Sequence, residues 1–249
     1  MRFGTGTNLL DSSTLSSLGS GETNLMDELA GRKYLAASND EWMLVDLGSA
    51  KLVSMIGIAG HNLTNADSFQ IQANSADSWG APAYDSTAIT AYYGTPMIAY
   101  PAQTYRYWRI RFNGSVSGTI AEARWAYFGD YTEVAKGIRY GASRQLESTR
   151  VISTMPDGSL NRSAGAQNMK TDIEISNLDY SVAYGALMTI GGTDRRLMFC
   201  DLTYGLANAQ RFYAYGSVSL GSLPHDMPNY TGSISLSITE LKVNFVGAI

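Results

Sequence analysis

Between residues 42 and 128, short segments alternate between apolar and polar residues, and this pattern restricts the fold more than any other feature. In the segment 105–112, one face of the expected strand carries Tyr105, Tyr107, Arg109 and Arg111. The opposite face carries Arg106, Trp108, Ile110 and Phe112. Further alternating or apolar segments lie at 42–48, 52–59 and 69–73. Because a period of two buries one face of a strand and solvates the other, we predict a two-sheet β-sandwich.

The composition fits this prediction. The 249 residues suffice for one large domain or two of ordinary size. Gly is abundant at 25 and Tyr reaches 16, which is typical of all-β proteins with many tight turns. With a net charge of −4 and no run of basic residues, we expect no specific nucleic-acid binding.

The single cysteine and the N-terminal residues indicate in which cellular compartment the protein is made. One Cys excludes an intrachain disulfide, and the apolar segment around Cys200 predicts a buried, inert thiol. The first residues lack the apolar region of a signal peptide, and no segment approaches the length of a membrane span. We therefore expect synthesis and assembly in a reducing cytoplasm, without export.

The order of segments in residues 1–130 resembles the galactose-binding-like (discoidin-type) jelly roll. The resemblance is carried by the strand Trp42-Met43-Leu44-Val45-Asp46-Leu47-Gly48 and by Tyr107-Trp108-Arg109-Ile110 near the end of the module. It implies a jelly-roll β-sandwich that binds a ligand and carries out no catalysis. By the same pattern, Trp42, Trp108 and Trp125 are expected in the core.

Residues 131–249 follow a different pattern. A hairpin is expected over 150–162, because Pro156 presets the first turn position and Gly158 accepts a left-handed one. Strands are expected at 170–175, 197–202, 211–218 and 232–241, and a short helix capped by Asp179 ends near residue 190. This order resembles the tail-tube-like β-sandwich of bacteriophage tail proteins, whose copies associate into rings.

Aromatic residues in the long connection of the jelly roll indicate a carbohydrate platform, since indole and phenol rings stack on a pyranose while Arg bonds its hydroxyls. The candidate binding residues are Trp79, Tyr84, Tyr92, Tyr93, Tyr107 and Arg109. The same residue types also anchor protein interfaces, so packing against a neighbouring subunit is the alternative.

The hairpin is the candidate subunit interface of the second part. Its candidate contact residues are Arg144, Arg150, Met155, Asp157, Leu160 and Arg162. Open sheet edges favour pairing with another copy, and a ring closes them by symmetry.

Other groups give weaker indications of chemistry. The carboxylates Asp46, Asp67, Asp77, Asp85 and Glu122 are scattered, so a glycoside-cleaving pair has no motif behind it. Asp46 is expected to cap the turn at Gly48, and His61 to serve a structural role. We expect no catalytic residues and no cofactor; Asp11, Asn39 and Asp40 are the candidates for a structural calcium ion.

Together the two resemblances imply a non-enzymatic virion protein of a phage tail or tail tip. It would form a homo-oligomeric ring, a hexamer or a trimer, and contact tube, hub and tape-measure proteins. The jelly roll would be displayed outward with weak binding to a host surface glycan, strengthened by avidity. A stand-alone lectin and a polysaccharide-degrading hydrolase are the alternatives.

Overall fold

The structure is a computed structural model of the chain. It describes residues 2–4, 8–26, 32–91, 96–133, 143–148, 152–157, 159–162, 167–178, 197–200, 213–220 and 232–239. These residues are mainly β-strand, and their helical structure consists of the 3₁₀ turns η1 (Leu9–Ser12) and η2 (Glu22–Leu25). The predicted mainly-β fold is confirmed. Within these ranges, no helix has the length and apolar character needed to cross a membrane.

The chain divides into two compact units. The first unit holds Arg2–Glu133 together with Met198–Tyr213, and the second holds Val134–Leu197 and Ala214–Ile249. The segment that returns to the first unit contributes β17 (Leu197–Cys200), which pairs antiparallel with β1 (Arg2–Gly4). On its other side β1 pairs with β12 (Tyr131–Glu133). The predicted division into residues 1–130 and 131–249 stays a prediction.

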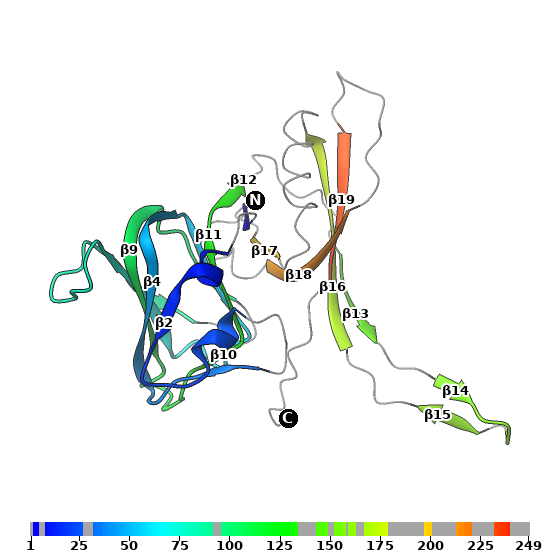
Figure 1. The fold of residues 1–249 in the computed structure, drawn as a ribbon. Helices are drawn as coiled ribbons and strands as arrows, with labels where there is room; N and C mark the ends of the chain where they lie inside the picture. Colours follow the sequence, from blue (N-terminus) through cyan, green and yellow to red (C-terminus); the bar gives the residue numbers. More distant parts are fainter. Residues whose placement is uncertain are drawn as a thin grey trace. The chain divides into compact units, whose positions relative to one another are not determined.

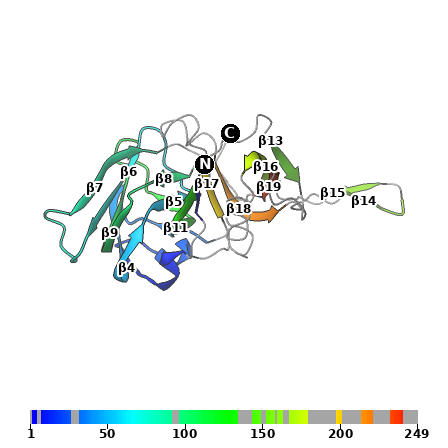
Figure 2. The same cartoon turned by 90° about the horizontal axis from the view of Figure 1, so that it is seen from above.

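The first unit is a sandwich of two antiparallel sheets (Figures 1 and 2). The larger, five-stranded sheet has the order β2 (Thr14–Ser16), β4 (Asp40–Val53), β9 (Gln103–Asn113), β6 (Ser68–Asn74) and β7 (Tyr84–Thr90). The smaller, three-stranded sheet has the order β11 (Trp125–Gly129), β5 (Met55–Ala59) and β8 (Met97–Ala99). A short pair, β3 (Tyr34–Leu35) and β10 (Glu122–Ala123), accompanies them. The predicted jelly-roll β-sandwich is confirmed for this unit.

The core lies between the two sheets. From the larger sheet, Val45, Ile71 and Trp108 are fully buried, and from the smaller one Ile58 and Phe128 are fully buried. The rings of Trp108 and Phe128 meet edge to face across the interface, with centroids 6.4 Å apart. Alternation along β9 therefore has the expected result, because its apolar face supplies one wall of the core.

Alternation is broken at the start of β9, where the structure corrects the sequence prediction. Tyr105, expected on the outer face, packs against the core beside Trp108. Arg106, expected on the inner face, instead forms a bidentate ion pair with Asp46 at 2.8 and 2.9 Å. The register between β4 and β9 shifts at this point, because four residues of β4 (47–50) and only Arg106 of β9 lie between the pairs Asp46–Tyr107 and Lys51–Tyr105.

The second unit has four neighbouring strands in the order β18 (Tyr213–Leu220), β19 (Gly232–Thr239), β16 (Gln167–Leu178) and β13 (Ser143–Ser148). The expected hairpin is present as β14 (Ile152–Thr154) and β15 (Leu160–Arg162). It lies beyond the ends of β13 and β16 (Figure 1). The helix expected over 179–190 lies outside the described residues.

Candidate functional site

The outer face of the five-stranded sheet carries a cluster of two indoles and a guanidinium. Arg109 points outward from the central strand β9. Its Cζ lies 3.8 Å from the ring centroid of Trp42, which belongs to β4 on one side of β9. The same Cζ lies 4.5 Å from the ring centroid of Trp79, in the β6–β7 connection on the other side. We call Trp42, Trp79 and Arg109 the outer-face cluster; contacts this close are cation–π interactions.

Hydrogen bonds from β6 and β7 hold Arg109 in place. The Nε of Arg109 donates to the Oε1 of Gln72 at 2.7 Å. The Nε2 of Gln72 donates to Asp85 at 2.6 Å, and the Nε2 of Gln70 donates to the other oxygen of Asp85 at 2.7 Å. Each group in this chain of bonds is oriented by the next, so the guanidinium is presented in one fixed orientation.

A bulge in β7 accompanies this chain of bonds. The register between β6 and β7 shifts between Gln70 and Gln72, and Thr87 has a φ of 59°. The backbone N–H of Thr87 donates to Asp85 at 2.8 Å. A left-handed backbone costs a residue with a Cβ about 1–2 kcal/mol, and bulges of this kind re-aim side chains beside functional sites. Here the bulge brings Asp85 within reach of both glutamines.

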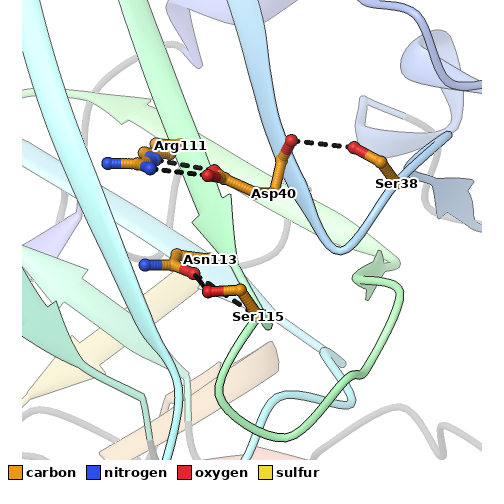
Figure 3. Close-up of polar contacts among 5 residues, drawn as sticks. All are labelled: Ser38, Asp40, Arg111, Asn113 and Ser115. Atoms are coloured by element: carbon orange, nitrogen blue, oxygen red, sulfur yellow. Dashed lines mark hydrogen bonds and ion pairs between the residues drawn. The ribbon is translucent and has the colours of Figure 1, made fainter.

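Further charged groups flank the cluster along β9. Arg111 lies two residues from Arg109, with its Cζ 5.7 Å from the Trp42 ring. Its charge is paired by Asp40 through two hydrogen bonds of 2.6 Å, as Figure 3 shows. Tyr107, the next outward residue in the other direction, has the Cζ of Arg106 4.7 Å from its ring centroid. The polar face of β9 is therefore a row of aromatic and cationic groups.

The pKa shifts agree with these contacts. Partial burial lowers the pKa of Arg109, because the charged form loses hydration between the indoles. Burial raises the pKa of Asp85, but the hydrogen bonds from Gln70 and Gln72 outweigh it and leave the pKa lowered. Through its hydrogen bonds to Arg106, the pKa of Asp46 falls to about 2. Both carboxyls are therefore ionised at neutral pH.

The candidate binding residues do not all meet at this cluster. Trp79, Tyr107 and Arg109 share the outer face of the larger sheet. Tyr84 packs against the core instead, with its ring centroid 6.3 Å from that of Trp108. Tyr92 and Tyr93 lie outside the described residues. A role in ligand binding stays a prediction for each of them.

Trp42 is the residue that the sequence interpretation misplaced. It was expected in the core with Trp108 and Trp125, which are 0% and 4% exposed, but it lies half-buried on the outer face. Period-two alternation along β4 places Trp42 correctly. Since Met43, Val45 and Leu47 are buried, Trp42 lies on the opposite, outer face together with Asp46. The size and hydrophobicity of the indole outweighed that signal in the prediction.

The scattered carboxylates each have a local partner. Asp46 accepts the N–H of Gly48 at 2.8 Å, which confirms its capping role. Asp67 accepts hydrogen bonds from Thr64 and Ser117, Asp77 from the Trp79 indole, and Glu122 from Lys33.

The proposed structural ion gains no support from the geometry. Asp40 pairs with Arg111 through both oxygens, so its carboxylate is already neutralised. Across the described ranges, no three His, Cys, Asp or Glu side chains gather closely enough to hold a metal ion. His61 is 2% exposed in the turn after β5, while His225 lies outside the described residues.

The candidate interface residues fall on the second unit. Met155 and Asp157 are exposed in the turn between β14 and β15, and Met155 is 45% exposed. The turn is closed by a backbone bond from Met155 to Ser159 of 2.8 Å and by Asp157 accepting the N–H of Ser159 at 2.9 Å. Arg144, Leu160 and Arg162 lie on β13 and β15. Arg150 lies outside the described residues.

Solved structures similar to this chain include several carbohydrate-binding modules. The chitosan-binding module 1 of a chitosanase/glucanase from Paenibacillus sp. IK-5 is 18% identical, with a TM-score of 0.41, over 50% of this chain and 100% of that one. The family 32 module of NanJ from C. perfringens, in complex with galactose, is 14% identical, with a TM-score of 0.39, over 50% of this chain and 97% of that one.

A third similar structure is a histidine mutant of the lectin binding domain of Lectinolysin, complexed with Lewis b. It is 13% identical, with a TM-score of 0.41, over 52% of this chain and 98% of that one. At these TM-scores the likeness does not extend to what this chain binds. No protein-family model matches the chain, and no curated protein sequence matches it.

Proposed function

We propose that the first unit binds carbohydrate through the outer face of its five-stranded sheet. The observation that supports this most strongly is the outer-face cluster, in which Trp42 and Trp79 flank the guanidinium of Arg109. An indole that stacks on a cation with one face can stack on the apolar face of a pyranose with the other. The polar row along β9 supplies partners for the sugar hydroxyls.

Two unpaired donors strengthen the proposal. Within the described part of the chain, the indole N–H of Trp42 and the hydroxyl of Tyr107 make no hydrogen bond to the protein. Both residues are partly exposed on the same face as Arg109. Sugar binding requires several such donors beside an aromatic surface, because each hydroxyl loses its hydration on binding. The proposed activity is therefore recognition of a carbohydrate ligand.

Replacing Trp79 tests the proposal with little risk to the fold. This side chain lies in the β6–β7 connection, and its contacts are the stack on Arg109 and the 2.7 Å bond to Asp77. We expect Trp79→Ala to weaken binding of the best glycan from an array by about tenfold, since ~1.4 kcal/mol of lost stacking is a factor of ten. Isothermal titration calorimetry measures the change.

Trp79→Phe is the matched control. It retains an aromatic face and should keep binding within about threefold of the natural chain, because ring stacking does not need the indole N–H. Equal affinity of Trp79→Ala and the natural chain would place the ligand elsewhere. Binding of no glycan on the array would contradict carbohydrate recognition as such.

For the second unit we propose a role in assembly, as a ring-forming structural protein of a phage tail or tail tip in the virion. The observation that favours it is the exposed hairpin β14–β15, whose turn presents the apolar side chain of Met155 to solvent. The hairpin is a two-stranded sheet of its own among the described strands, and the open edges of such a sheet can pair with a neighbouring copy. Several copies would then multiply weak sugar binding through avidity.

Deleting residues 155–160 tests assembly. We expect the natural chain to form a hexamer or trimer by size-exclusion chromatography with light scattering, and the deletion variant to elute as a monomer. The four Trp residues all lie in 2–133, so their fluorescence should show unchanged unfolding of the first unit. A deletion variant that still assembles, or a natural chain that stays monomeric, would refute the role of the hairpin.

A further inference from the structure

The free edge of the Arg109 guanidinium limits what the outer-face cluster can bind. Its faces contact Trp42 and Trp79, and its Nε is bonded to Gln72. Within the described part of the chain, the two terminal nitrogens, Nη1 and Nη2, have no hydrogen-bond partner. Their N–H groups lie in the guanidinium plane, so stacking leaves them available to a ligand. The end of the guanidinium thus presents a pair of unused, parallel donors.

Such a pair matches one kind of acceptor best. Two parallel N–H groups fit the two oxygens of a carboxylate, and these charge-assisted bonds are roughly twice as strong as neutral ones. A single sugar hydroxyl would use one donor of the pair and leave the other without an acceptor. The shape of the free edge therefore favours an anion with two oxygens in one plane.

The charges around the cluster are arranged consistently with an anionic ligand. The nearest carboxylate, Asp85, is occupied by Gln70, Gln72 and the backbone of Thr87, and Gln72 stands between it and Arg109. Asp40 and Asp46 are each bonded to another arginine, Arg111 and Arg106. Arg109 is therefore the one outward arginine of β9 with no acidic hydrogen-bond partner among the described residues. Asp85 compensates its charge only through space, across Gln72, and partial burial between two indoles strengthens pairing with an incoming anion.

We infer that the ligand of the outer-face cluster is an acidic sugar, a uronate or sialate, whose carboxylate bonds to Nη1 and Nη2 of Arg109 while its ring stacks on an indole. This inference rests on the proposed carbohydrate binding and specifies its substrate class. Trp42 would supply a further donor from its indole N–H. Gln72 and Asp85 are positioning residues, since they act by orienting the guanidinium.

The test uses the full chain on an array of matched glycan pairs. Each sialylated or uronate-containing glycan is printed beside its neutral parent or methyl ester, with sulfated glycans of the same backbone as a third set. We expect carboxylated members to bind at least about tenfold more tightly than their neutral partners, the difference that one bidentate charged contact supplies. A sulfate group can also bond to both nitrogens, but its oxygens are weaker hydrogen-bond acceptors than those of a carboxylate, so sulfated glycans should bind more weakly than carboxylated ones.

Two variants assign the selectivity to Arg109. Arg109→Gln should bring the ratio between carboxylated and neutral members close to one, while leaving the thermal unfolding of the first unit cooperative. Arg109→Lys should recover charge but little selectivity, because an ammonium group has no planar fork. Arg124→Gln removes an arginine between β10 and β11, away from the outer face, and should leave the ratio unchanged.

Four outcomes would contradict the inference or the proposed function. Equal binding of acidic and neutral members would overturn the inference while leaving carbohydrate binding intact. A preference for sulfated glycans would overturn the assignment to a carboxylate. Retained selectivity in Arg109→Gln would show that a group other than Arg109 recognises the carboxylate, which would overturn the inference. Binding of no glycan would overturn both the inference and the proposed function.

Discussion

Replacing Glu41 with alanine should destabilise the first unit by about 3 kcal/mol or more, because buried groups left without a hydrogen-bond partner cost about 1–3 kcal/mol each. Glu41 is 4% exposed on β4. Its carboxyl oxygens accept the N–H of Gly19 at 2.7 Å, the N–H of Ala37, and the Tyr34 hydroxyl at 3.2 Å. The side chain thus ties two loops and β3 to the larger sheet.

The burial of Tyr34 shows that water is excluded from the surroundings of Glu41. Its side chain is fully buried against Phe112, with ring centroids 5.6 Å apart, and burial raises the pKa of its hydroxyl well above the usual range. Water therefore cannot replace the carboxyl group of Glu41 without opening the packing. We expect Glu41→Gln to recover only part of the loss, because its amide group turns a donor toward a backbone N–H.

The measurement is urea unfolding followed by Trp fluorescence, which reports on the first unit because all four Trp residues lie within it. The neighbouring Asp40→Ala is the control. That residue forms a partly exposed ion pair with Arg111, so its removal should cost less than about 1 kcal/mol. Similar losses for Glu41→Ala and Asp40→Ala would contradict the role assigned to the buried carboxyl.

Trp108→Ala should lower the free energy of unfolding of the same unit by about 3–5 kcal/mol, the range seen when a large buried aromatic is truncated. The indole is fully buried between the sheets and contacts the rings of Phe128, Tyr84 and Tyr105. Its N–H donates to the carbonyl of Tyr105 at 3.1 Å. Truncation would leave a cavity between the sheets and remove the indole hydrogen bond to the partly buried Tyr105 carbonyl.

Trp42→Ala is the matched comparison, since it removes the same side chain from the opposite face of the same sheet. We expect a loss of stability of about 1 kcal/mol, the scale of an exposed cation–π contact, together with weakened glycan binding. Urea unfolding and calorimetry separate the two effects. A large loss of stability for Trp42→Ala, or a small one for Trp108→Ala, would contradict the assignment of inner and outer faces.

Much of the first unit was predictable because strand periodicity is local. Alternation in 105–112 identifies Trp108, Ile110 and Phe112 as core, and all three are buried. It also puts Arg109 and Tyr107 on the solvated face. The reversal at Tyr105 and Arg106 was not predictable, because it depends on a register shift against β4, a strand distant in sequence.

For the same reason, the sequence predicted only part of the candidate site. Trp79 and Arg109 were selected by residue type, but their stacking requires the β6–β7 connection to fold over β9. Tyr84 was selected by the same criterion and packs inward. The partners that orient Arg109, Gln72 and Asp85, come from two further strands, and no short-range pattern links them.

By itself, the sequence determined the mainly-β class, the sandwich strands of the first part and a hairpin within 150–162, because alternation and turn chemistry act within a few residues. Only the tertiary structure decided that β17 pairs with β1 of the first unit, that Glu41 is a buried anchor and that Trp42 and Trp79 enclose Arg109. Those features depend on which strands become neighbours and in which register, and this is settled by packing between residues far apart in the chain.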